Sequence, residues 1–134
     1  MKHLSAENLL EIVRSLRSDV DQAQRRRQPR VGMRHTVRLI PCDPAQIPLP
    51  EHAERAWVRD VSRKGLGLLV GQTFELDQTV LLEISSDTHG GIAHLLGRVV
   101  RCEEISSDNC HVGIELILDT PQDEIAKLTD RIPA

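Results

Sequence analysis

The first hydrophobic pattern along the chain is helical. Five apolar residues recur at helical spacing and form one stripe: Leu9, Ile12, Val13, Leu16 and Val20. This spacing predicts an amphipathic helix over residues 5–22, with Ser5 as its N-cap. Three roles stay open for the stripe: packing on the rest of the chain, pairing with a second copy as a homodimer, or docking on a partner protein.

From residue 33 the hydrophobic period changes to two, which is the period of a strand. Alternation and turn residues divide this region into six predicted strands: residues 33–40, 55–61, 66–70, 78–84, 93–103 and 110–118. No helical pattern interrupts them, so an antiparallel sheet is expected, and closure into a small barrel would remove its exposed edges. Thr120 and Pro121 then mark the start of a second helix.

We therefore predict a mostly β fold: a six-stranded antiparallel β-barrel with an N-terminal helix and a C-terminal helix. The 134 residues suit one barrel domain over residues 24–134, preceded by the helix at 1–23. The polar and basic segment 22–29 is expected to be a flexible connector. We expect the C-terminal helix to plug one end of the barrel or cover one side, and Trp57 to lie in the core.

Composition narrows the class of protein further. The chain has one Phe, one Trp and no Tyr, which excludes RNA-binding modules that stack bases on exposed aromatic side chains. No apolar run approaches the roughly 20 residues of a membrane span, and Glu7 and Glu11 interrupt the first apolar stretch, so neither a span nor a secretory signal is expected. Three cysteines without tight spacing favour a reduced, cytoplasmic protein.

The charge is distributed unevenly along the chain. The formal net charge is −3, yet six arginines and no acidic residue lie within residues 23–38. Arginine offers a planar fork of donors that matches phosphate oxygens and the O6/N7 edge of guanine. An acidic protein with one arginine-rich segment indicates a single anion site more than a surface for duplex nucleic acid.

Two short motifs give this site a possible identity. One is an RxxxR formed by Arg26 and Arg30 and preceded by Arg25, and the other is a DxSxxG over residues 60–65. Together with the later segments LLGRVVRCEE and NCHVGIEL, they resemble the PilZ domain family, the bacterial receptors for cyclic di-GMP. The resemblance covers roughly residues 24–132.

The resemblance implies a non-enzymatic receptor that holds no metal and no cofactor, and whose ligand is cyclic di-GMP. Carried onto this sequence, the family's ligand contacts are Arg25, Arg26, Arg30, Asp60, Ser62 and Gly65. An arginine before the RxxxR implies an intercalated dimer of the ligand. The segment 24–32 would act as a switch that signals to a downstream partner in motility, pilus assembly, exopolysaccharide production or transcription.

These residue types suit that ligand chemically. Each arginine can form bidentate, charge-assisted hydrogen bonds to a phosphate or to a guanine edge. Asp60 can accept from guanine N1–H and N2–H or orient an arginine, and Ser62 can donate to a phosphate or to the turn backbone. Gly65 either gives the turn a positive φ or lets the ligand approach closely.

Other interpretations compete with this one. The arginine run can be a solvated linker or a nonspecific contact with nucleic acid or membrane, and DxSxxG can serve only to close a hairpin. A PilZ-fold adaptor would act through protein contacts without nucleotide. Acidic residues on the predicted strands disfavour nucleic acid as a partner. A zinc site is not expected, because the spacings of His89, His94, Cys102, Cys110 and His111 match no common ligand pair.

Overall fold

The computed structural model describes residues 6–24, 35–62, 64–86, 91–117 and 122–129. The predicted ligand residues Arg25, Arg26 and Arg30 lie outside these ranges, whereas Asp60, Ser62 and Gly65 lie within them. The fold and the site are therefore described for the barrel and its two helices.

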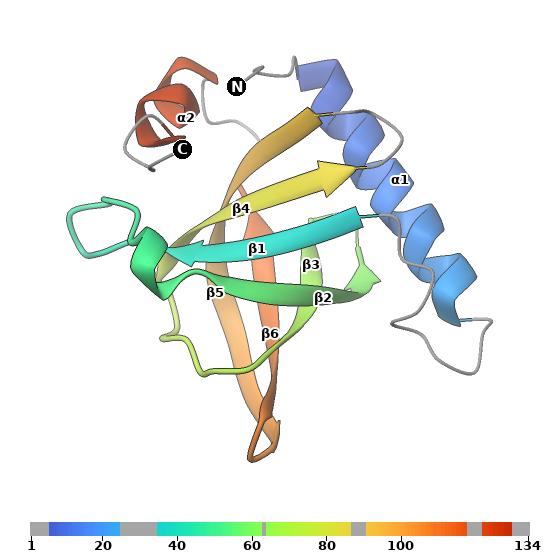
Figure 1. Ribbon diagram of the computed structural model, residues 1–134, viewed down its shortest axis with the longest axis vertical. Helices are drawn as coiled ribbons and strands as arrows, with labels where there is room; N and C mark the ends of the chain where they lie inside the picture. The colour runs from blue at the N-terminus through green and yellow to red at the C-terminus, as the bar shows by residue number, and fades with distance from the viewer. Residues whose placement is uncertain (1–5, 25–34, 63, 87–90, 118–121, 130–134) are drawn as a thin grey trace.

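Six antiparallel strands form a closed barrel in the order β1-β2-β3-β6-β5-β4 (Figure 1). The strands are β1 (His35–Pro41), β2 (Glu54–Val61), β3 (Gly65–Val70), β4 (Thr79–Ser86), β5 (Gly91–Ser106) and β6 (Asn109–Leu116). The helices are α1 (Ala6–Gln24) before the barrel and α2 (Gln122–Thr129) after it, with a short 3-10 turn η1 (Pro50–His52) between β1 and β2. The predicted fold class is confirmed.

The barrel interior is filled by aliphatic side chains from alternate positions of the strands. Val37 and Leu39 on β1 are buried in the core, whereas Thr36, which lies directly before Val37, is exposed. Phe74 belongs to the same core and contributes one aromatic ring to it. Period-two alternation therefore predicted the inward face correctly, because each strand of a small barrel has only one face toward the interior.

The expectation that Trp57 lies in the core is wrong. Ala56 and Val58 are the buried residues of this part of β2, so the side chain between them points to the outer face. There Trp57 is partly buried, and the Arg55 guanidinium lies 4.5 Å from its ring centroid. The indole is covered by a cation–π contact rather than by the barrel core.

The N-terminal helix closes one end of the barrel. Figure 1 shows α1 beside the start of β1 and the end of β4. Leu16 and Val20 are buried in the same core as the inward strand residues, and Val13 packs against it. These three side chains of the apolar stripe therefore pack within the chain. A homodimer through other parts of the helix stays a prediction. The domain boundary at residue 23 also stays a prediction.

The C-terminal helix takes the side-covering role rather than the plugging role. It contacts β5, and its Ile125 is buried. The end of the barrel next to the start of β1 is filled by α1 instead, because α1 is longer and carries the apolar stripe.

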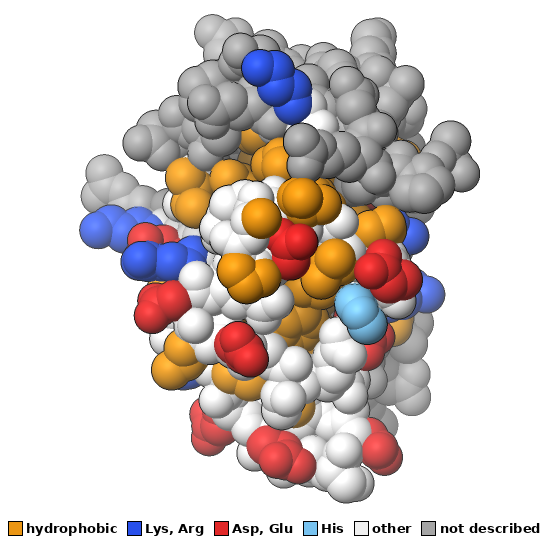
Figure 2. All heavy atoms as spheres, turned by 90° about the vertical axis from the view of Figure 1, so that its left-hand side faces the viewer, with side chains coloured by type: hydrophobic (Ala, Val, Ile, Leu, Met, Phe, Trp, Pro, Cys, Tyr) orange, Lys and Arg blue, Asp and Glu red, His pale blue; other side chains and the backbone are white. Residues whose placement is uncertain are grey.

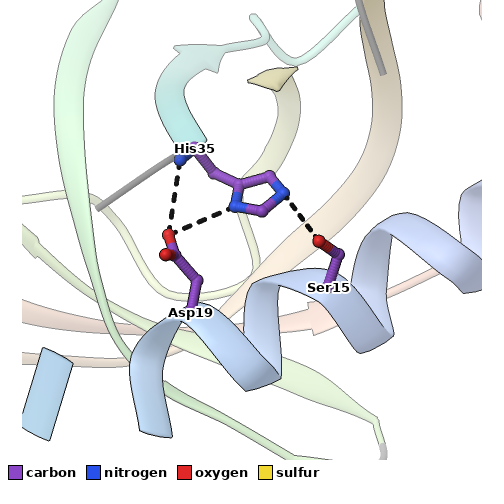
Figure 3. Close-up of polar contacts among 3 residues, drawn as sticks. All are labelled: Ser15, Asp19 and His35. Atoms are coloured by element: carbon purple, nitrogen blue, oxygen red, sulfur yellow. Dashed lines mark hydrogen bonds and ion pairs between the residues drawn. The ribbon is translucent and has the colours of Figure 1, made fainter. Parts of the chain in front are cut away.

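A buried polar cluster fixes α1 to the first strand (Figure 3). The Asp19 Oδ2 accepts from the His35 backbone N–H at 3.3 Å and lies 3.2 Å from the His35 Nδ1. On the other side of the ring, Nε2 lies 3.1 Å from the Ser15 hydroxyl. Asp19 and His35 are almost completely buried, so the cluster joins the two elements that flank residues 25–34.

The outer surface is mixed rather than basic on the face drawn in Figure 2. Hydrophobic side chains are exposed near the centre of this face, acidic side chains lie among and below them, and Lys and Arg lie toward the edges. Across the strands and loops that the structure describes, the exposed acids include Glu75, Asp77, Glu103, Glu104 and Glu115. Neither described helix is long and apolar enough to cross a membrane.

Candidate functional site

The DxSxxG motif forms the turn between β2 and β3. The Ser62 backbone N–H donates to the Gly65 carbonyl at 2.9 Å. The Ser62 hydroxyl lies 3.3 Å from that carbonyl and accepts from the Gly65 N–H at 3.2 Å. The motif therefore closes the hairpin, as the structural interpretation predicted, and it leaves Ser62 exposed beside the turn.

Gly65 is required for a close approach and not for a positive φ. A Cβ at this position would collide with the Ile114 carbonyl oxygen of β6, and the residue is outside the left-handed region. The close contact is with the neighbouring strand. The expected positive φ is therefore not found, the glycine is needed for packing against β6, and a close approach of the ligand stays a prediction.

Asp60 is presented by an irregularity in β2. The register between β2 and β3 shifts between Val58 and Asp60, as in a bulge that redirects a side chain. The carboxylate lies over Gly67, where a Cβ would stand 2.5 Å from both of its oxygens. Any larger residue at position 67 would therefore displace the acid, whose side chain is 54% exposed.

These residues line a cavity of about 230 Å³ on the outer face of the barrel. Asp60, Ser62 and Gly65 come from the β2–β3 hairpin, and the opposite wall is Val100, Arg101 and Gly113 from β5 and β6. The structure thus brings together the three predicted site residues that it describes. The structure does not place Arg25, Arg26 and Arg30 relative to this cavity.

Two residues near the cavity were missed by the sequence reading. Arg101 lines it, and its Nη2 lies 3.4 Å from the His111 Nδ1. The His111 Nε2 lies 3.5 Å from the Asp60 Oδ2. No local pattern marks either residue, because their approach to Asp60 depends on the pairing of four strands.

Of the cysteines and histidines weighed as metal ligands, all but His89 lie among the described residues. Cys42, Cys102 and Cys110 are free thiols, and the residues that the structure describes hold no group of three or more His, Cys, Asp or Glu fit for a metal ion. Burial raises the pKa of Cys110, and burial together with Asp43 raises the pKa of Cys42 to about 11. Both stay protonated at neutral pH, which makes them poor nucleophiles and poor metal ligands.

Fold and cavity together define a small closed β-barrel domain with a surface site. The model of the PilZ domain family matches residues 24–132, most of the chain, and the protein belongs to this family. A PilZ domain is a non-catalytic receptor domain that typically binds cyclic di-GMP. No curated protein and no solved structure shows significant similarity to the chain.

Proposed function

We propose that this protein is a cyclic di-GMP receptor that signals to a partner protein from the cytoplasm. The observation that carries the proposal is that a PilZ domain keeps the RxxxR and DxSxxG motifs, and that Asp60 and Ser62 of the second motif line one cavity. The ligand contacts would be Arg25, Arg26, Arg30, Asp60, Ser62 and Gly65.

The charges of the two motifs suit different parts of the ligand. Cyclic di-GMP carries two phosphates and two guanines, and the arginines supply the positive charge that the phosphates need. Asp60 would repel a phosphate, so its carboxylate is suited to the N1–H and N2–H donors of guanine. Ser62 already exchanges hydrogen bonds with Gly65 and therefore supports the hairpin while its exposed side meets the ligand.

Chain connectivity supplies a route from binding to signalling. The arginine segment joins the end of α1 to the start of β1, and the buried contact between Asp19 and His35 holds these two ends together. Ligand binding would draw the segment toward Asp60 and change what the end of α1 presents to a partner in motility, pilus assembly, exopolysaccharide production or transcription.

Calorimetric titration with cyclic di-GMP tests the proposal, with two arginines of the same segment as a matched pair. Arg30→Ala should cost about 2–4 kcal/mol of binding because it removes a charge-assisted contact. Arg27 lies between the motif arginines, so Arg27→Ala should cost little binding free energy. If the wild-type protein gives neither heat nor a thermal shift with excess ligand, the receptor proposal fails and a PilZ-fold adaptor remains.

The same titration measures the stoichiometry. Arg25 precedes the RxxxR and can stack on an exposed guanine, so we expect two intercalated ligand molecules per chain. Arg25→Leu keeps a side chain at this position but removes the guanidinium, and should move the ratio toward one. A ratio of one in the wild-type protein, unchanged in Arg25→Leu, would show that Arg25 belongs only to a solvated basic run.

A further inference from the structure

An acid and an arginine face each other across two glycines on the outer surface of the barrel. Asp60 on β2 is the cross-strand partner of Gly67 on β3, Gly67 pairs with Gly113 on β6, and Gly113 pairs with Arg101 on β5. Neighbouring strands lie about 5 Å apart. The row therefore leaves a floor of two adjacent strands without side chains between the two charged groups.

Both charged side chains lean over this floor. The Asp60 carboxylate lies over Gly67, and the Arg101 Cβ and Nε lie 3.3 and 3.6 Å from where a Cβ of Gly113 would be. The register of β5 shifts between Val99 and Arg101, as that of β2 does before Asp60. Two bulges therefore flank the floor and turn Asp60 and Arg101 toward the same cavity.

His111 holds these two side chains near one another. Arginine nitrogens only donate, so the His111 Nδ1 that faces the Arg101 Nη2 is the acceptor, and a neutral ring then carries its proton on Nε2. That Nε2 faces Asp60, is buried, and makes no hydrogen bond with any described residue. The imidazole therefore lies between the Asp60 carboxylate and the Arg101 guanidinium and limits how far each can move.

The charge of the cavity points to a base and not to a phosphate. Among the described residues that line it, one cation and one anion, Arg101 and Asp60, balance each other, and the carboxylate opposes a second anion. A neutral, flat molecule with acceptors on one edge and donors on another can form hydrogen bonds with both Arg101 and Asp60. The glycine floor lets such a ring lie against the backbone.

We infer that Arg101 is a specificity-determining residue that reads the guanine held by Asp60, an inference that rests on the proposed function. Arg101 donates to O6 and N7 of the base, and Asp60 accepts from N1–H and N2–H. Adenine places an amino donor where guanine has O6 and an acceptor where guanine has N1–H, so both walls reject it. His111 is a positioning residue that keeps the guanidinium in place.

The test compares two arginines of β5 by titration with cyclic di-GMP. Arg101→Gln should weaken binding at least tenfold. Arg98→Gln is the matched control: Arg98 is exposed on the same strand, is paired with the exposed Glu115 and does not line the cavity. Arg98→Gln removes the same charge and should change the affinity for cyclic di-GMP less than twofold. Both variants are first shown to be folded by their thermal melts.

A second variant separates base reading from simple charge, and does not depend on the first one folding. Arg101→Lys keeps the positive charge but loses the planar pair of guanidinium donors. This variant should therefore also bind cyclic di-GMP weakly, and it should lose the preference for cyclic di-GMP over cyclic di-AMP. Wild-type affinity in Arg101→Lys, or equal effects of the glutamine variants at 101 and 98, would overturn the inference. Absence of binding by the wild-type protein would instead overturn the proposed function.

Discussion

Removing the Asp19 carboxylate should destabilise the protein far more than removing an exposed acid of the same helix. Oδ2 of Asp19 is the acceptor for two groups of His35, the backbone N–H at 3.3 Å and Nδ1 at 3.2 Å (Figure 3). The side chain is 1% exposed, so water cannot replace the lost acceptor. In Asp19→Ala two buried groups of His35 lose this partner.

The size of the effect follows from these contacts. Leaving a buried donor without its acceptor typically costs about 1–3 kcal/mol, and Asp19→Ala does this for two groups of His35. Both distances lie at the long end of the hydrogen-bond range, and removing the carboxylate also removes its own desolvation cost, so we expect about 2–4 kcal/mol. Asp19→Asn keeps an acceptor for the backbone N–H and should fall between the wild-type protein and Asp19→Ala.

Urea denaturation of the full chain measures this cost, with Asp21→Ala as the control. Asp21 is exposed on the same helix and should change the free energy of unfolding by less than about 0.5 kcal/mol. His35→Ala and the double variant complete a cycle, and the coupling between Asp19 and His35 should exceed about 1 kcal/mol. Equal effects of the two aspartate variants, or a coupling near zero, would refute the reasoning.

Two further predictions concern Asp60 and Cys42. Asp60→Asn keeps an oxygen acceptor for guanine and should weaken cyclic di-GMP binding less than Asp60→Ala; equal affinity of the wild-type protein for cyclic di-AMP would contradict base reading. Because the pKa of the Cys42 thiol is raised to about 11, mainly by burial, the folded state keeps a proton that the unfolded state loses. The free energy of unfolding should therefore fall as the pH rises from about 9 to about 11, and Cys42→Ala should reduce this fall in alkaline denaturation.

The fold was predictable because its signals are local. Each strand of a small barrel buries alternate residues, so Val37 and Leu39 mark β1 without any knowledge of its neighbours. The ends of elements were less exact: β5 continues to Ser106 and β6 begins at Asn109, where the sequence suggested a longer loop. Hairpin pairing beyond the hydrophobic region extends the two strands, and backbone hydrogen bonds leave no mark on the hydrophobic pattern.

The residues that line the candidate cavity were predictable only where they coincide with a turn motif. Asp60, Ser62 and Gly65 stand out because a turn needs particular residues at fixed spacing. Arg101 and His111 approach Asp60 through the pairing of β2, β3, β6 and β5, and a bulge sets the direction of Arg101. In the sequence Asp19 looks like an ordinary polar residue of α1. Its partner His35 lies beyond the arginine segment, and the two side chains come into contact only when α1 closes the end of the barrel.

The packing of α1 limits what a ligand can move. Leu16 is fully buried and Val20 nearly so, and withdrawing both from the core would cost about 3–6 kcal/mol. The Asp19 contact adds to this cost. A ligand that binds with micromolar affinity gains about 8 kcal/mol in total, and can shift a conformational equilibrium only by its difference in affinity between the two states. Release of the whole helix would therefore consume most of that free energy. A change confined to the end of α1 and the segment between Asp19 and His35 leaves the core packed, and it links the arginines to the surface that a partner would read.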